Sequence, residues 1–244
     1  MNLVLQGLDD CHPRLERIAA LTAPKRVTRV SDTALRCEGI AFSPALRQTI
    51  EVAAHAAELD ATYMMGSQHL ADYRLVAMDM DSTLINIECI DEIADMQGLK
   101  PQVAAITEAA MRGELDFAES LRRRVALLEG LDASALQRVF EERLRLSPGA
   151  DRMLKAVQAA GLKTLLVSGG FTYFTDRLKP LLGLDFTRAN QLEIVDGKLT
   201  GKVLGDIVDA DAKRATVEQV CAQLGISPDQ AIVKSTLLNW IHTW

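Results

Sequence analysis

The sequence predicts an α/β fold in which a mostly parallel sheet is interrupted by a block of helices and preceded by a small N-terminal module. The short, continuous apolar run at residues 75–78 is typical of a strand in a parallel sheet, which is covered on both faces, and residues 163–167, KTLLV, are a second predicted strand. Strand and helix patterns alternate over residues 149–233, as parallel connections require. Residues 91–148 show helical patterns throughout, which indicates an insertion between the first two strands.

Residues 1–70 form the predicted N-terminal module. Leu3–Leu5 is a short strand candidate, and apolar residues between Leu15 and Leu21 recur at helical spacing. A second helix is expected over residues 45–59, because Ser43-Pro44 is a typical helix start. The module contains no catalytic pattern, so we expect a structural or weakly regulatory extension.

The predicted core comprises residues 71–90 and 149–233. Its later elements are, in order, a helix at 150–160, a strand at 163–167, a helix at 173–182, a hairpin turning at Asp196-Gly197, a helix at 212–224 and a strand that starts at 231. The break at Ser147-Pro148-Gly149 separates this core from the helical insertion.

Composition excludes several classes of protein. The chain has 244 residues, 48% of them hydrophobic, and a net charge of −6. The chain can therefore bury a hydrophobic core. It lacks the clustered basic residues of a protein that binds nucleic acid, so we expect no nucleic-acid partner. No apolar run approaches the ~20 residues that cross a bilayer, and we expect a cytoplasmic protein without a membrane partner. A homodimer is compatible with the sequence. Reduced thiols are expected at the cysteines, which fit no zinc or redox spacing: Cys11, Cys37, Cys89 and Cys221.

An aspartate pair follows the first buried strand, in the run DMDST at residues 79–83. Ligands of open parallel sheets bind beyond the carboxyl ends of the strands. Asp79 and Asp81 would repel each other there unless a cation lies between them or they do different jobs. Mg²⁺ suits carboxylate and phosphate oxygens alike. One aspartate can attack phosphorus and the other can transfer protons, while Ser82 and Thr83 donate hydrogen bonds to phosphate.

The order of these elements resembles the phosphatases of the haloacid dehalogenase superfamily: a strand, DMDST, a helical insertion, LLVSGG, and a helix with a lysine. Four segments resemble the phosphoserine phosphatase family, within residues 73–232: DMDSTLINIECIDEIADMQG, EAAMRGELDFAESLRRRVALLEGL, LLVSGGF and DGKLTG. The resemblance implies a Rossmann-like core, a helical cap at 91–148 and, over residues 1–70, an ACT-like extension. It also implies Mg²⁺-dependent hydrolysis of O-phospho-L-serine through an aspartyl-phosphate, the last step of serine biosynthesis.

The same resemblance assigns a role to each matching residue. It gives three catalytic residues, which are the nucleophile Asp79, the general acid/base Asp81 and the phosphoryl-binding Lys213. Asp79 and the backbone carbonyl of Asp81 would hold the metal. The substrate-binding residues would be Glu88 for the ammonium, Arg124 for the carboxylate, Met111 and Phe117 as apolar walls, and Ser168 and Gly169 for the phosphate.

The chain departs from the family after its last predicted strand. The family motif G-D-G-x-N-D, whose first acid is a Mg²⁺ ligand, is expected near residues 235–239, where this chain reads STLLN. No Asp or Glu follows Asp229. We therefore expect residues 234–244 to be an aberrant tail that arises from a frameshift, and turnover slower than that of a complete relative. Two alternatives stay open: an impaired remnant that binds phosphorylated small molecules, and a phosphatase of the same superfamily for another small phosphomonoester.

Overall fold

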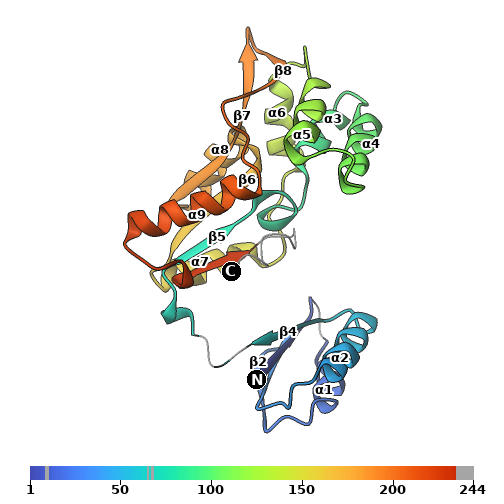
Figure 1. Ribbon diagram of the computed structural model, residues 1–244, viewed down its shortest axis with the longest axis vertical. Coiled ribbons are helices and arrows are strands. Elements are labelled where there is room, and N and C mark those ends of the chain that lie inside the picture. Colours follow the sequence, from blue (N-terminus) through green and yellow to red (C-terminus); the bar gives the residue numbers. More distant parts are fainter. Residues whose placement is uncertain (9–10, 65, 67–68, 235–244) are drawn as a thin grey trace. The chain divides into compact units, whose positions relative to one another are not determined.

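The computed structural model describes residues 1–8, 11–64, 66 and 69–234, and the chain divides into two compact units (Figure 1). The first unit comprises residues 1–69 and the second residues 70–244. The first unit has one hydrophobic core, and the second has two, one on each face of its sheet. The expected aberrant tail lies outside the described residues, except for the backbone of Lys234.

The N-terminal unit is a four-stranded antiparallel sheet with two helices on one of its faces (Figure 1). Leu3 and Leu5 are buried against the helices while Val4 between them is partly exposed, as the two-residue repeat of a strand requires. Ser43 caps the second helix, because its hydroxyl accepts from the Leu46 N–H at 3.1 Å. The elements are β1 (Asn2–Gln6), α1 (His12–Ala20), β2 (Arg26–Ser31), β3 (Ala34–Glu38), α2 (Pro44–Ala56) and β4 (Asp60–Met64).

The larger unit is built on a five-stranded sheet in the order β8-β7-β6-β5-β9. The pairs β5–β6, β5–β9 and β6–β7 are parallel, and β7–β8 is an antiparallel hairpin, so the predicted α/β class is confirmed. The hairpin turns at Asp196 and Gly197 as predicted, and both have positive φ. The strands are β5 (Leu75–Met78), β6 (Lys163–Phe171), β7 (Phe186–Val195), β8 (Lys198–Leu204) and β9 (Ala231–Lys234).

Helices cover both faces of β5, which explains why all four of its residues are buried. Leu75 and Ala77 pack with α9 (Ala210–Leu224) in one core. Val76 and Met78 belong to the other core, together with α7 (Ala150–Ala159) and α8 (Thr172–Leu182). The continuous apolar run is therefore the signature of a strand between two helical layers.

The insertion between β5 and β6 is helical, as predicted. The ends of the inserted segment pair with each other, since Ile85 bridges Leu146 and the Ser147 N–H donates to the Leu84 carbonyl. Farther along, the insertion is joined to β8, where Leu199 exchanges two backbone hydrogen bonds of 2.8 Å with residues 130 and 131. These contacts hold the insertion beside the sheet. Its elements are α3 (Cys89–Asp95), α4 (Lys100–Met111), α5 (Phe117–Ala126), α6 (Ser134–Arg138) and the helical turn η3 (Val139–Arg143).

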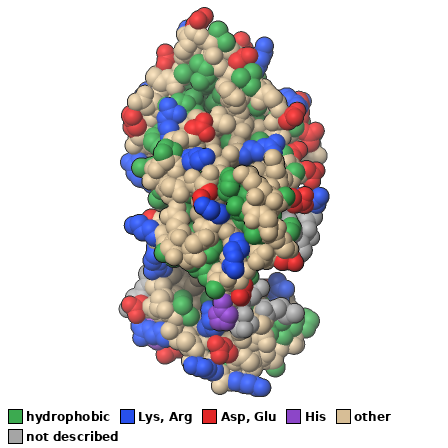
Figure 2. Space-filling model, turned by 90° about the vertical axis from the view of Figure 1, so that its left-hand side faces the viewer, with side chains coloured by type: hydrophobic (Ala, Val, Ile, Leu, Met, Phe, Trp, Pro, Cys, Tyr) green, Lys and Arg blue, Asp and Glu red, His purple; other side chains and the backbone are tan. Residues whose placement is uncertain are grey.

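One face of the protein is mixed in charge (Figure 2). On the face that Figure 2 shows, Lys and Arg side chains are interspersed with Asp and Glu, whereas a nucleic-acid site needs a clustered basic surface. None of the helices in the described part of the chain combines the length and the apolarity that crossing a membrane requires.

Candidate functional site

Asp79 follows β5 directly and is 6% exposed. Its Oδ1 accepts from the Met80 N–H at 2.8 Å, and its Oδ2 accepts from the Lys213 Nζ at 2.7 Å. Lys213 lies in the first turn of α9, which Asp209 caps by accepting from the Ala212 N–H at 2.9 Å. The structure therefore joins the first predicted catalytic aspartate and the predicted lysine, which are 134 residues apart in sequence, in one buried ion pair.

Asp81 lies in the short turn η2 (Met80–Leu84), where Ser82 adopts a positive φ of 50°. The Cys89 N–H donates to Asp81 Oδ1 at 3.0 Å. Burial of the carboxyl group raises its pKa to about 7, with further contributions from the negative charges of Glu88 and Asp79. Asp81 can therefore hold or release a proton near neutral pH, which is what a general acid/base requires.

The run Ser168–Gly170 lies at the same edge of the sheet, because Met78 of β5 pairs with Leu166 of β6. The Ser168 hydroxyl accepts from the Gly170 N–H at 2.9 Å, which fixes the loop internally. Gly170 lies against the second aspartate, and a β-carbon there would collide with Asp81 Oδ2. The absence of a side chain at this position allows the two loops to approach each other.

Two of the predicted substrate-binding groups come from the insertion and its entrance. Glu88 precedes α3 and accepts from the Ser82 hydroxyl at 2.6 Å. Arg124 lies on α5 and is half-buried. Its burial lowers the pKa of the guanidinium, and the nearby carboxylates oppose this change, in the order Asp91, Glu88 and Asp81. The structure therefore places the Arg124 guanidinium within electrostatic range of Asp81 and of the neighbouring carboxylates Glu88 and Asp91.

The two predicted apolar walls differ in their surroundings. Phe117 begins α5 and lies against Gly169, where a β-carbon would be only 2.7 Å from the Phe117 Cζ. Met111 ends α4 and is 84% exposed, so it packs against little of the chain in this conformation. Phe117 thus contacts the loop Ser168–Gly170, whereas the structure leaves Met111 unpacked.

Asn190 of β7 is a buried residue of this region that the sequence analysis missed. It is 1% exposed, its Nδ2 donates to the Gly169 carbonyl at 2.8 Å, and its Oδ1 accepts from the Val208 N–H at 2.8 Å. Asparagine is depleted in strands, so its place in the strand-like run FTRANQLEIV was a signal that could have identified it.

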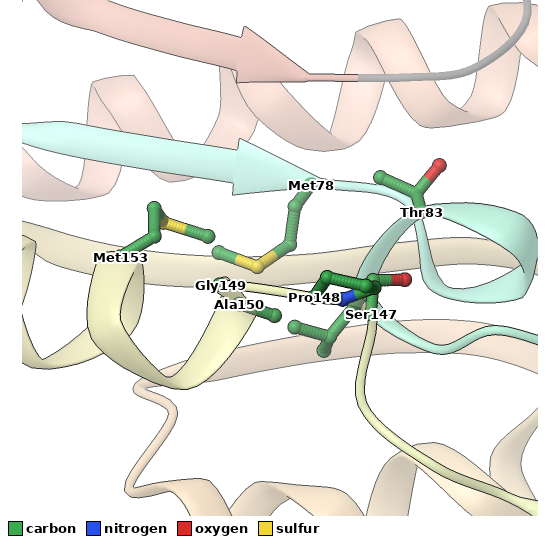
Figure 3. A pocket seen from close by; sticks show the side chains of 8 residues that line it. Met78, Thr83, Ser147, Pro148, Gly149, Ala150 and Met153 are labelled. Carbon is green, nitrogen blue, oxygen red and sulfur yellow. The ribbon is translucent and has the colours of Figure 1, made fainter. Parts of the chain in front are cut away.

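A pocket lies between β5 and α7, next to the turn η2 that carries Asp81 (Figure 3). Met78 and Met153 extend toward each other in it, and Pro148 and Ala150 form another side (Figure 3). No charged residue belongs to its described lining. A phosphate group is bound by positively charged side chains or by N–H donors. This pocket is therefore a poor phosphate site compared with the region around Asp79 and Lys213.

Comparisons with known proteins agree with this arrangement. The family of haloacid dehalogenase-like hydrolases matches residues 73–233. The phosphoserine phosphatase of Polaromonas sp. is 60% identical over 168 residues, which cover 67% of this chain and 71% of the relative.

Two solved structures extend the comparison. A haloacid dehalogenase family hydrolase from Salmonella enterica serovar Typhi has a TM-score of 0.81 and 30% identity, over 95% of this chain and 81% of that chain. The phospho-aspartyl intermediate analogue of a phosphoserine phosphatase has a TM-score of 0.62 and 38% identity, over 66% of this chain and 77% of that chain. The chain therefore belongs to the phosphoserine phosphatases of the haloacid dehalogenase-like hydrolase family.

Proposed function

We propose that this chain hydrolyses O-phospho-L-serine to L-serine and phosphate, as the last step of serine biosynthesis, with Asp79 as the nucleophile. The observation that carries the proposal is the buried Asp79–Lys213 pair, at 2.7 Å, beside an Asp81 whose pKa is about 7. A carboxylate nucleophile held by a lysine and a second carboxyl group that can carry a proton are the two groups that a two-step phosphate transfer needs.

In the first step an Asp79 carboxylate oxygen attacks phosphorus, and the bond from phosphorus to the serine oxygen breaks. The serine oxygen receives the proton of Asp81, so serine leaves neutral at that oxygen and Asp79 carries the phosphoryl group. In the second step Asp81 takes a proton from water, the resulting hydroxide attacks phosphorus, and the bond to Asp79 breaks. Lys213 compensates the phosphoryl charge, and stabilising this charge is a main part of such catalysis.

The substrate carries an ammonium, a carboxylate and a phosphate, and the proposed site offers a group for each. Glu88 would bind the ammonium and Arg124 the carboxylate, for which its planar fork is suited. Ser168 and Gly169 would donate to the phosphate oxygens. The Phe117 ring, 39% exposed, would form an apolar wall. Met111 would complete that wall only if α4 moved or bound substrate covered it.

The donor set at this edge is compatible with Mg²⁺. Asp79 through its side chain and Asp81 through its backbone carbonyl are hard oxygen ligands, and Mg²⁺ in proteins is commonly held by one or two carboxylates together with substrate phosphate and water. Within the described residues, no group of three or more His, Cys, Asp or Glu side chains could hold a metal ion. When bound, Mg²⁺ would neutralise charge on the phosphoryl oxygens.

A phosphate-release assay with phosphoserine and Mg²⁺ tests the proposal, using protein of verified mass. Asp79→Asn should abolish turnover, because an amide is a far weaker nucleophile than a carboxylate. Asp176→Asn, on α8 outside the set assigned to the site, is the matched control and should retain turnover.

The substrate is tested separately, with a phosphomonoester that lacks the ammonium and the carboxylate. Equal kcat/KM for that compound and phosphoserine would contradict the proposed substrate. Binding of phosphoserine in calorimetry without any phosphate release would instead identify an impaired remnant.

A further inference from the structure

The loop Ser168–Gly170 is a bulge in the strand ladder. On β6, Val167 pairs with Arg188 of β7, and the next pair is Phe171 with Asn190. Three residues of β6 therefore stand opposite a single residue of β7, and a bulge of this kind leaves backbone groups without ladder partners. The Gly169 carbonyl is one such group, and it receives the Asn190 side-chain N–H at 2.8 Å in place of a backbone donor.

The other end of the same amide holds the segment that leads into α9. The Val208 N–H donates to Asn190 Oδ1 at 2.8 Å, and Val208 directly precedes Asp209, the capping residue of the helix. The Asp209 carbonyl in turn accepts from the Lys213 N–H at 2.9 Å. The buried side-chain amide of Asn190 thus connects the loop Ser168–Gly170 with the start of α9, the helix that carries Lys213.

We propose that Asn190 is a positioning residue that fixes Ser168 and Gly169 relative to the Lys213 helix. The expected effect of this positioning role on turnover rests on the proposed function. Only a side chain with one donor and one acceptor can satisfy the Gly169 carbonyl and the Val208 N–H together. Aspartate would place a second acceptor against the carbonyl, and leucine would leave both backbone groups unsatisfied in a buried site. Either change must move one segment away from the other.

Kinetics of Asn190→Asp test the role, with Gln191→Glu as the matched control. Gln191 is the exposed neighbour on the same strand, so it undergoes the same amide-to-acid change without a link to the loop. Asn190→Asp should lower kcat by about 100-fold, because displacements near 1 Å can cost that much. KM should change less than kcat, since Glu88 and Arg124 are untouched and only the phosphate donors Ser168 and Gly169 shift. A kcat within twofold of the unmodified chain, or a loss that only follows the unfolded fraction, would overturn the role.

Hydrogen exchange provides a readout that does not depend on turnover. Val208 lies outside any helix or strand, yet its amide should exchange at least about 100-fold more slowly than an exposed loop amide, because it is bonded and buried. Asn190→Ser, which keeps a small polar group if the acid prevents folding, should accelerate this exchange, and Gln191→Glu should not. Fast exchange in the unmodified chain would refute the positioning role. If the Val208 amide were protected from exchange in the unmodified chain but neither that chain nor any variant released phosphate, the proposed function would be refuted and the positioning role would not.

Discussion

The close contact between Gly170 and Asp81 makes Gly170→Ala a sharp test of the site. Gly170 does not have the positive φ that disfavours alanine, so the effect of the change is steric. The added β-carbon would collide with Asp81 Oδ2 and would lie 2.8 Å from the Met80 Cε. Met80 is fully buried, and Asp81 is held by the Cys89 N–H at 3.0 Å, so neither can move freely.

The expected cost of this overpacking is about 1–3 kcal/mol of unfolding free energy. In a domain of this size, that lowers the Tm by about 2–4 °C per kcal/mol. Because the carboxyl group that transfers protons must shift, kcat should fall by about 100-fold in the folded protein. Calorimetric melting and phosphate release from phosphoserine measure the two effects separately.

Gly169→Ala is the matched control for this prediction. The nearest atom to its added β-carbon is the Phe117 Cζ, at 2.7 Å, which is the far end of a partly exposed side chain that can turn aside. Its kcat should therefore fall by less than about tenfold, which corresponds to under 1.4 kcal/mol. If Gly170→Ala kept the kcat of the unmodified chain, or if both variants lost the same activity, Asp81 would not be the proton-transferring group.

Three further predictions concern charge. Lys213→Met should lower the free energy of unfolding, measured in urea, by about 3–5 kcal/mol, because it leaves the buried Asp79 carboxylate without this partner. Adding Asp79→Asn to this variant should recover part of the lost stability. If the losses from the two substitutions were additive, the pairing would be contradicted. Arg124→Lys should raise KM for phosphoserine by about tenfold or more with a smaller change in kcat, since lysine lacks the bidentate fork; an unchanged KM would exclude a carboxylate contact. Inorganic phosphate should lower the Kd for Mg²⁺, measured by calorimetry, by at least about tenfold. If the Kd for Mg²⁺ were equal with and without phosphate, the metal site would be completed by protein ligands alone.

Much of the larger unit could be predicted because its signals are local. The run at 75–78 is apolar at every position since helices cover both faces of β5, and the Asp196-Gly197 turn is specified by two residues that tolerate positive φ. The helices at 173–182 and 212–224 also correspond to α8 and α9. By contrast, β2, β3 and β4 were not predicted. In β2, exposed residues stand at four of six positions, so its pattern lacks the alternation of a half-buried strand.

The site was predictable to a different degree at each residue. Asp79 and Asp81 follow a recognisable strand, but the partner of Asp79 lies 134 residues away and no spacing rule links the two. Resemblance to a family supplied Lys213, and it also supplied Met111, whose exposed side chain makes no packed wall here. Asn190 was missed because its role depends on a bulge in the neighbouring strand, which is a property of the register and cannot be inferred from either strand alone.

The predicted coupling between Mg²⁺ and phosphate rests on the charge balance at the end of β5. Asp79 shares its carboxylate with Lys213, so part of its negative charge is already compensated before any metal binds. Asp81 has a pKa of about 7 and carries only part of a charge at neutral pH. Two such groups attract a divalent cation weakly, whereas a bound phosphate adds both negative charge and oxygen ligands. Because linkage is reciprocal, a metal that depends on phosphate must also increase the affinity for phosphate, and the substrate itself would then complete the site in which it reacts.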